Sequence, residues 1–179
     1  MLATELIRVL KGNLVGKAET KFNVISSDTE KSFQLKSLEA LLLSQNSKDS
    51  HKNSIFINFN TKEKGQLQNI ISKVSNSENC KIYNVETKLR DLDDQGCWTD
   101  DFIEKFKKQI KGLVTSDASK PCFLILNGFE KTFSYMKSNR TVFDLINFFK
   151  VKELKNIRSI NFFVIRDQID TQIYKYLIS

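Results

Sequence analysis

The run Cys122-Phe123-Leu124-Ile125-Leu126 is the most apolar stretch of the chain, and Asn127-Gly128 follows it directly. A short, continuous apolar run is typical of a strand that is covered on both faces, because side chains that point to either side must then be hydrophobic. We therefore predict a central, buried strand at this position.

Further strands and helices are predicted on both sides of this run. The predicted strands are Phe22 to Ile25, Ile55 to Phe59, Ile82 to Val85 and Ile160 to Ile165. The predicted helices are Ser32 to Ser44, one with Leu67, Ile70, Ile71 and Val74 on its apolar face, one capped by Thr99, one that begins at Thr141, and one from Asp167 to Leu177. Strands that alternate with helices imply βαβ units, a mostly parallel central sheet and helices on both faces. The expected fold class is α/β, in a single domain over residues 1–179.

The composition suits one intracellular globular domain. The chain has 179 residues, of which 40% are hydrophobic. Cys80, Cys97 and Cys122 form no CxxC pair and His51 is the single histidine, so we expect reduced thiols and no structural zinc site. The first residues lack the long apolar core of a signal peptide, and no apolar stretch approaches the length of a membrane span. We expect neither a cofactor nor contact with a membrane.

The segment after the first predicted strand aligns with a phosphate-binding loop. In the pattern G-x-x-x-x-G-K-[ST], the glycines let backbone N–H groups surround the phosphates, the Lys reaches the β- and γ-phosphates, and the hydroxyl holds magnesium. The segment Ile25-Ser26-Ser27-Asp28-Thr29-Glu30-Lys31-Ser32 keeps the Lys31-Ser32 pair but has Ile25 and Glu30 at the glycine positions. The alternative for Lys31 is a solvated lysine in the first turn of a helix.

The carboxylates that a working NTPase needs are also replaced. The second predicted strand leads into Asn58 and Asn60 where a carboxylate should activate water, and the central strand ends at Asn127 where an Asp should order magnesium. An amide supplies no charge to hold a divalent cation. We therefore expect a degenerate nucleotide site at Lys31, Ser32, Asn60 and Asn127, without ATP hydrolysis. Weak nucleotide binding through Lys31 and Ser32 is the alternative.

In the order of these elements the chain resembles the RecA-like recombinase family, especially its divergent eukaryotic paralogues and the small subunits of the yeast Shu complex that lack Walker motifs. The likeness rests on the phosphate-loop helix, on Ile125-Leu126-Asn127-Gly128-Phe129-Glu130, and on a last strand that ends in Phe162-Phe163-Val164-Ile165-Arg166-Asp167-Gln168-Ile169. The resemblance implies a RecA-like P-loop core. It also implies a non-catalytic, nuclear accessory subunit that binds a paralogous partner and DNA and assists homologous recombination and recombinase filament assembly.

A second hypothesis comes from another class of complex. The chain would be a structural pseudo-ATPase subunit of another RecA-like assembly, such as the Elongator subcomplex, where the fold serves assembly and tRNA contact. In that case the protein would be cytoplasmic.

Basic residues near the predicted strand ends are the candidates for DNA contact. The net charge of +7 favours a polyanionic ligand, and a solvated basic surface is the alternative. In open α/β sheets, ligands bind at the carboxyl ends of the strands. The candidates that follow such strand ends are Lys131, Lys137, Arg140 and Arg166. Phe133 and Tyr135 lie between the two lysines and would either stack on bases or simply pack. We expect little sequence preference.

The N-terminal segment, residues 1–20, is the candidate partner-binding region. Its apolar residues include Leu2, Leu6, Ile7 and Leu10. We expect them to contact a paralogous RecA-like subunit in a heteromer; packing on their own domain is the alternative.

Overall fold

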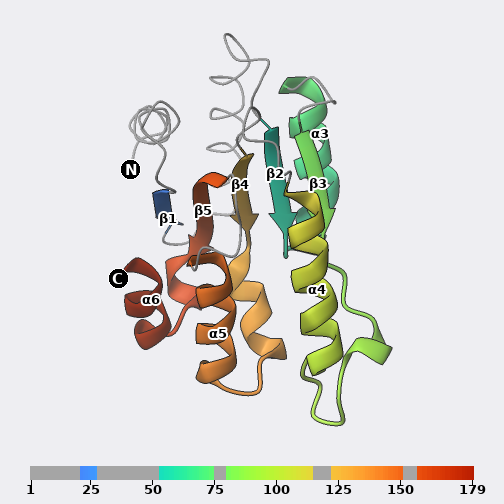
Figure 1. The fold of residues 1–179 in the computed structure, drawn as a ribbon, viewed down its shortest axis with the longest axis vertical. Helices are drawn as coiled ribbons and strands as arrows, with labels where there is room; N and C mark the ends of the chain where they lie inside the picture. Colours follow the sequence, from blue (N-terminus) through green and yellow to red (C-terminus); the bar gives the residue numbers. More distant parts are fainter. Residues whose placement is uncertain (1–20, 28–52, 75–79, 115–121, 151–156) are drawn as a thin grey trace.

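The computed structural model describes residues 21–27, 53–74, 80–114, 122–150 and 157–179, which include a five-stranded sheet in the order β1-β5-β4-β2-β3 (Figure 1). The strands are β1 (Lys21–Ser27), β2 (Asn53–Asn58), β3 (Cys80–Asn84), β4 (Cys122–Asn127) and β5 (Ile157–Ile165). Every neighbouring pair of strands is parallel. The α/β class and the central position of β4 are therefore confirmed.

The described helices connect and flank these strands. The α-helices are α3 (Lys64–Val74), α4 (Asp100–Leu113), α5 (Asn139–Lys150) and α6 (Thr171–Ile178). The 3-10 helices are η1 (Thr61–Glu63), η3 (Leu89–Asp91), η4 (Phe129–Tyr135) and η5 (Arg166–Gln168). The predicted helix from Ser32 to Ser44 lies outside the described residues.

Alternating side chains of the strands supply two hydrophobic faces. Ile57, Leu126 and Phe162 stand in register across β2, β4 and β5, and they belong to one core with Phe106 of α4 and Phe149 of α5. The residues one position earlier in these strands point to the opposite face because the side-chain period of a strand is two. Figure 1 shows α4 in front of the sheet and α3 behind it. Both faces of the sheet are thus covered, as the apolar β4 run predicts.

Local capping explains where the helices begin. The Thr99 hydroxyl accepts a hydrogen bond from the Phe102 backbone N–H at 3.2 Å, so α4 starts at the predicted cap. Helix α5 begins at Asn139, two residues before the predicted Thr141. The predicted last helix is divided, because the Asp170 carboxylate caps the backbone N–H of Gln172 and Ile173 and so begins α6 after the separate turn η5.

The chain connections diverge between β2 and β4. After β2 the chain passes through α3 to β3 at one edge, whereas after β4 it passes through η4 and α5 to β5 on the other side. The carboxyl ends of β2 and β4 therefore lie at a topological switch point, the place where open α/β sheets bind ligands. Within the described ranges, no helix combines the length and apolarity that a membrane span requires.

Candidate functional site

A row of asparagines crosses the sheet at the switch point. Asn84, Asn58 and Asn127 are the last residues of β3, β2 and β4, and they stand in register. The Asn58 Nδ2 donates to Asn84 Oδ1 at 3.0 Å, and the Asn127 Nδ2 donates to Asn58 Oδ1 at 3.2 Å. The backbone N–H of Asn60 also donates to Asn58 Oδ1, at 3.1 Å. We call Asn84, Asn58 and Asn127 the asparagine row.

Asn58 and Asn127 of the asparagine row are buried, whereas Asn84 is partly buried. Asn58 is 0% exposed and Asn127 is 1% exposed, while Asn60 just beyond β2 is 5% exposed. Buried polar groups must be hydrogen-bonded, and these three bonds use both amide ends of Asn58. The Asn127 side chain and the Asn60 backbone N–H, both at the predicted degenerate site, therefore have a structural task, which is to tie the ends of adjacent strands together through Asn58.

Gly128 allows the chain to leave β4 close to Asn60. Its φ of +77° lies in the left-handed region, and a Cβ placed there would come within 3.0 Å of the Asn60 Cβ. The Phe59 N–H bonds to the Asn127 carbonyl at 2.9 Å and the Gly128 N–H bonds to the Phe163 carbonyl at 3.2 Å. The parallel ladder thus continues past the asparagine row and holds Phe59 beside it.

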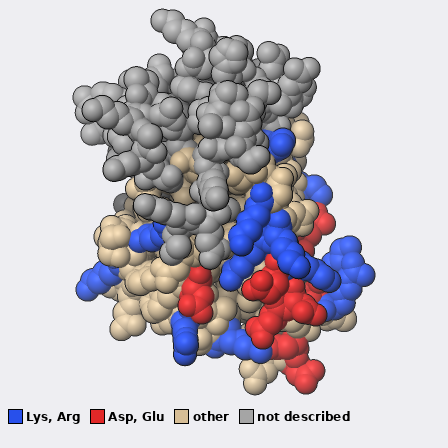
Figure 2. All heavy atoms as spheres, in the orientation of Figure 1, with Lys and Arg blue, Asp and Glu red and all other residues tan. Residues whose placement is uncertain are grey.

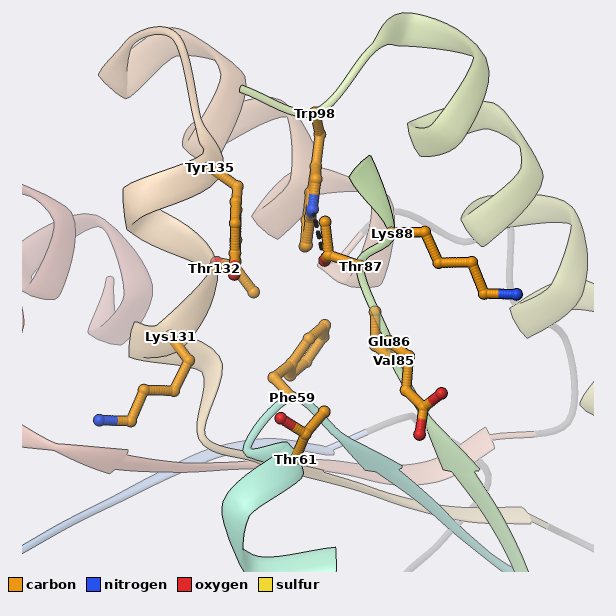
Figure 3. Close-up of a pocket in the computed structure, with 10 residues that line it drawn as sticks. All are labelled: Phe59, Thr61, Val85, Glu86, Thr87, Lys88, Trp98, Lys131, Thr132 and Tyr135. Atoms are coloured by element: carbon orange, nitrogen blue, oxygen red, sulfur yellow. Dashed lines mark hydrogen bonds between the residues drawn. The ribbon is translucent and has the colours of Figure 1, made fainter. Parts of the chain in front are cut away.

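A cavity of about 350 Å³ opens just beyond these strand ends. Figure 3 shows Phe59 on one side of the cavity and the rings of Trp98 and Tyr135 on the opposite side. The hydroxyl-bearing side chains of Thr87 and Thr132 complete its walls. We call this space the switch-point pocket, because it lies over the carboxyl ends of β2, β3 and β4.

The aromatic wall of the pocket is fixed from several directions. The rings of Trp98 and Tyr135 are stacked, with centroids 5.4 Å apart and an interplanar angle of 6°. The backbone N–H of Trp98 also donates to the Tyr135 backbone carbonyl at 2.8 Å. The Trp98 Nε1 donates to Thr87 Oγ1 at 2.9 Å. Phe59 packs against Phe129 with ring centroids 5.7 Å apart. The pocket is therefore largely pre-formed.

Charged side chains surround the pocket. Figure 3 shows Lys131 and Lys88 on opposite sides of it, with their ammonium groups directed outward. Lys131 Nζ donates to Gln168 Oε1 at 2.8 Å. The carboxylate of Glu86 pairs with Lys64 at 2.9 Å, and this hydrogen bond and the Lys64 charge lower the pKa of Glu86. The negative charge of Glu86 is thus balanced by the positive charge of Lys64.

The four candidate DNA residues fall into two groups. Lys131 in η4 and Arg166 in η5 directly follow β4 and β5, at the carboxyl edge of the sheet. Lys137 follows η4, and Arg140 lies in the first turn of α5. The seven-residue 3-10 helix η4 lies between the end of β4 and this second group. The four candidates thus belong to different parts of the fold, which are η4, the connection after it, the start of α5, and η5.

Besides Lys131, which donates to Gln168, two further candidates have internal partners. Lys137 Nζ lies 3.0 Å from Asp93 Oδ2, and this hydrogen bond raises the pKa of Lys137. The pKa of Asp93 is lowered, first by the hydrogen bond from the Cys97 N–H and then by Lys137. The Arg166 guanidinium stacks on the Tyr174 ring at 4.2 Å and donates to the Ile169 carbonyl at 3.2 Å. These contacts hold the loop before α4 and the start of α6.

The aromatics between the lysines pack within the domain. Phe133 meets Phe129 edge to face at 5.5 Å, and one face of Tyr135 lies against Trp98. For Phe133, and for the face of Tyr135 that meets Trp98, the structure thus shows packing within the domain, which was one of the two interpretations of these rings. Tyr135 nevertheless also lines the switch-point pocket.

Sequence reasoning missed a basic surface on α4. Figure 2 shows Lys and Arg side chains gathered over the later part of this helix and acidic side chains over its first turn. The basic residues are Lys105, Lys107, Lys108 and Lys111. Lys107 and Lys111 lie over the Phe148 ring at 5.7 and 5.8 Å. The lysine-rich polar side of this helix is visible in the sequence, but a solvated helix face produces the same pattern.

Several candidate residues lie outside the described parts of the chain. They are Lys31 and Ser32 of the phosphate-loop segment and Leu2, Leu6, Ile7 and Leu10 of the N-terminal segment. Among the residues that are described, His, Cys, Asp and Glu side chains form no group of three or more that would hold a metal ion.

Comparison with known proteins gives no assignment. No protein-family model matches the chain, and no curated protein matches it significantly.

Proposed function

We propose that the chain is a non-catalytic RecA-like subunit that binds a paralogous partner and DNA, and that it assists homologous recombination and recombinase filament assembly in the nucleus. The proposal combines the resemblance in the order of elements with the chemistry at the carboxyl ends of the strands. The five-stranded parallel sheet is compatible with a RecA-like core.

The observation that carries the proposal is the asparagine row. A P-loop NTPase needs carboxylates near these strand ends to order magnesium and to activate water. This chain instead has buried amides, and both amide ends of Asn58 are occupied by Asn84, Asn127 and the Asn60 backbone. An Asn58 so engaged supports a scaffolding role in place of a catalytic one.

The first experiment measures ATP hydrolysis. Purified chain is incubated with ATP and magnesium, with and without single-stranded DNA, beside the variant Lys31→Ala. We expect equal, background rates from the two proteins. A turnover that DNA stimulates and that Lys31→Ala abolishes would overturn the non-catalytic part of the proposal.

The second experiment identifies the partner. The tagged chain is purified from cells that express it, and mass spectrometry identifies the proteins that co-purify. We expect a RecA-like recombinase paralogue, and we expect substitution of Leu6 and Ile7 by Asp to release it. Recovery of Elongator subunits with tRNA would favour the second hypothesis, and a stable monomer by light scattering with no partner recovered would contradict both.

A further inference from the structure

The switch-point pocket has the size and walls of a site for a small planar ligand. Its volume of about 350 Å³ is near the lower end of the range for ligand pockets, so it suits a single ring system with few substituents. Phe59 offers a ring on one side. The Thr87 hydroxyl, which accepts from Trp98 Nε1, still has its proton to donate, and the Thr132 hydroxyl, which donates to the Phe129 carbonyl, still has a lone pair to accept. This combination of an aromatic surface with a few polar groups is what a nucleobase requires, since every base has a π-face and polar edges.

The charges around the pocket match a nucleic-acid backbone. Lys131 and Lys88 flank the pocket on opposite sides, and the Glu86 carboxylate is paired with Lys64 (Figure 3). A single strand that crosses the opening would thus meet one cation before the inserted base and another after it. An uncharged ligand, such as an apolar peptide side chain, would have no use for two flanking ammonium groups.

We infer that the switch-point pocket receives one unstacked base of single-stranded DNA, whose backbone crosses from Lys131 to Lys88. This inference rests on the proposed function, because it specifies how the chain holds DNA. The base lies against Phe59, and the flanking phosphates meet the two lysines. Recognition is tolerant of sequence because stacking and charge supply it.

The test uses Trp98, the only tryptophan of the chain, which forms part of the pocket wall. The full chain, alone and with its partner, is titrated with an oligo-dT of about 15 nucleotides, a length within the site sizes of single-strand-binding domains. We expect binding to change the Trp98 emission. An abasic oligomer of the same length carries the same phosphates without bases, and we expect it to bind more weakly and to leave the emission unchanged.

Two variants separate the pocket from the backbone contacts. Thr61 is exposed at the rim, so Thr61→Phe should fill the pocket without disturbing the core, abolish the emission change and weaken oligo-dT binding about tenfold. Thr171→Phe on α6 is the matched control and should change neither. Lys88→Gln should lower the salt dependence of binding and keep the emission change.

The outcomes distinguish this inference from the proposed function. If oligo-dT and the abasic oligomer bind equally and Thr61→Phe has no effect, the base does not enter the pocket although DNA binding stands. If thymidine monophosphate alone saturates the emission change as readily as oligo-dT, the pocket is a site for free nucleotides. If no single-stranded DNA binds with or without the partner, the proposed function itself fails.

Discussion

Asn127 and Asn58 meet across two adjacent parallel strands, where Asn127 Nδ2 donates a hydrogen bond of 3.2 Å to Asn58 Oδ1. Asn58 is 0% exposed, and its Oδ1 also accepts from the Asn60 N–H at 3.1 Å. Water cannot replace these bonds easily in a site that is closed to solvent. The asparagine row therefore contributes to stability at a position where a P-loop NTPase would require the charge of a carboxylate.

A carboxylate at this position should destabilise the fold. We expect Asn58→Asp to lower the free energy of unfolding by about 3 kcal/mol at neutral pH, because it buries an unpaired charge and removes the donor to Asn84 Oδ1. Burial raises the pKa of the introduced carboxyl, so the loss should diminish as the pH falls and the group becomes protonated. Urea denaturation at several pH values measures this effect.

The control for this experiment is Asn84→Asp. Asn84 is only partly buried, so its charge keeps some contact with water and the loss should be smaller. Equal losses for the two variants, or a loss at Asn58 that does not depend on pH, would show that the buried charge is not the cause.

Local patterns predicted the strands but not the contacts between them. The apolar run of β4 and the Thr99 cap each depend on residues close together in sequence. The asparagine row joins residues that are 69 positions apart, so its geometry depends on strand register that no local pattern reveals. The stacking of Trp98 on Tyr135 likewise depends on how η4 leaves the sheet. The candidate site could thus be placed at the strand ends, whereas its pocket could not.

The Asp93 carboxyl should titrate below its ordinary pKa. The hydrogen bond from the Cys97 N–H is the larger cause of this lowered pKa, and Lys137 is the next. The contribution of ionised Asp93 to the free energy of unfolding is therefore fully present above the ordinary pKa of an Asp, and it is lost as the pH falls through the lowered pKa. In Lys137→Gln we expect the pKa of Asp93 to rise but to remain below the ordinary value, because the Cys97 hydrogen bond is the larger cause. A carbon-detected NMR titration measures both proteins, and full return to the ordinary value would refute this order of causes.

Removal of candidate cations should change the salt dependence of DNA binding unequally. Arg140 is exposed at the start of α5, so Arg140→Gln should reduce the slope of log K against log salt by about 0.7, as expected for one contact with a single strand. Lys137→Gln should reduce it less, because the Lys137 ammonium is already paired with Asp93 at 3.0 Å. Lys175→Gln on α6 is the control of equal charge change. Identical slopes for all three variants and the wild type would mean that the region around Arg140 does not contact DNA.

Substitution of Gly128 should cost more than substitution of another glycine with the same backbone conformation. Gly96 and Gly128 both have a φ of +77°, so an alanine at either position pays a similar strain of about 1–2 kcal/mol. At Gly96 no atom lies within 4 Å of the added Cβ, whereas at Gly128 the Cβ would lie 3.0 Å from the Asn60 Cβ and 3.3 Å from the Asn60 nitrogen. Because the Asn60 N–H is held by Asn58 Oδ1, the neighbour cannot move without weakening the asparagine row.

We therefore expect Gly128→Ala to destabilise the chain by about 1 kcal/mol more than Gly96→Ala, an overpacking cost at the low end of the usual range. Urea unfolding of the two variants measures the difference, and strain common to both positions cancels in it. The second readout is the backbone amide of Asn60, whose hydrogen exchange should accelerate in Gly128→Ala and stay unchanged in Gly96→Ala. Equal stability losses with unchanged exchange at Asn60 would mean that the close approach of β4 to the end of β2 does not constrain residue 128, and that only its left-handed backbone selects glycine.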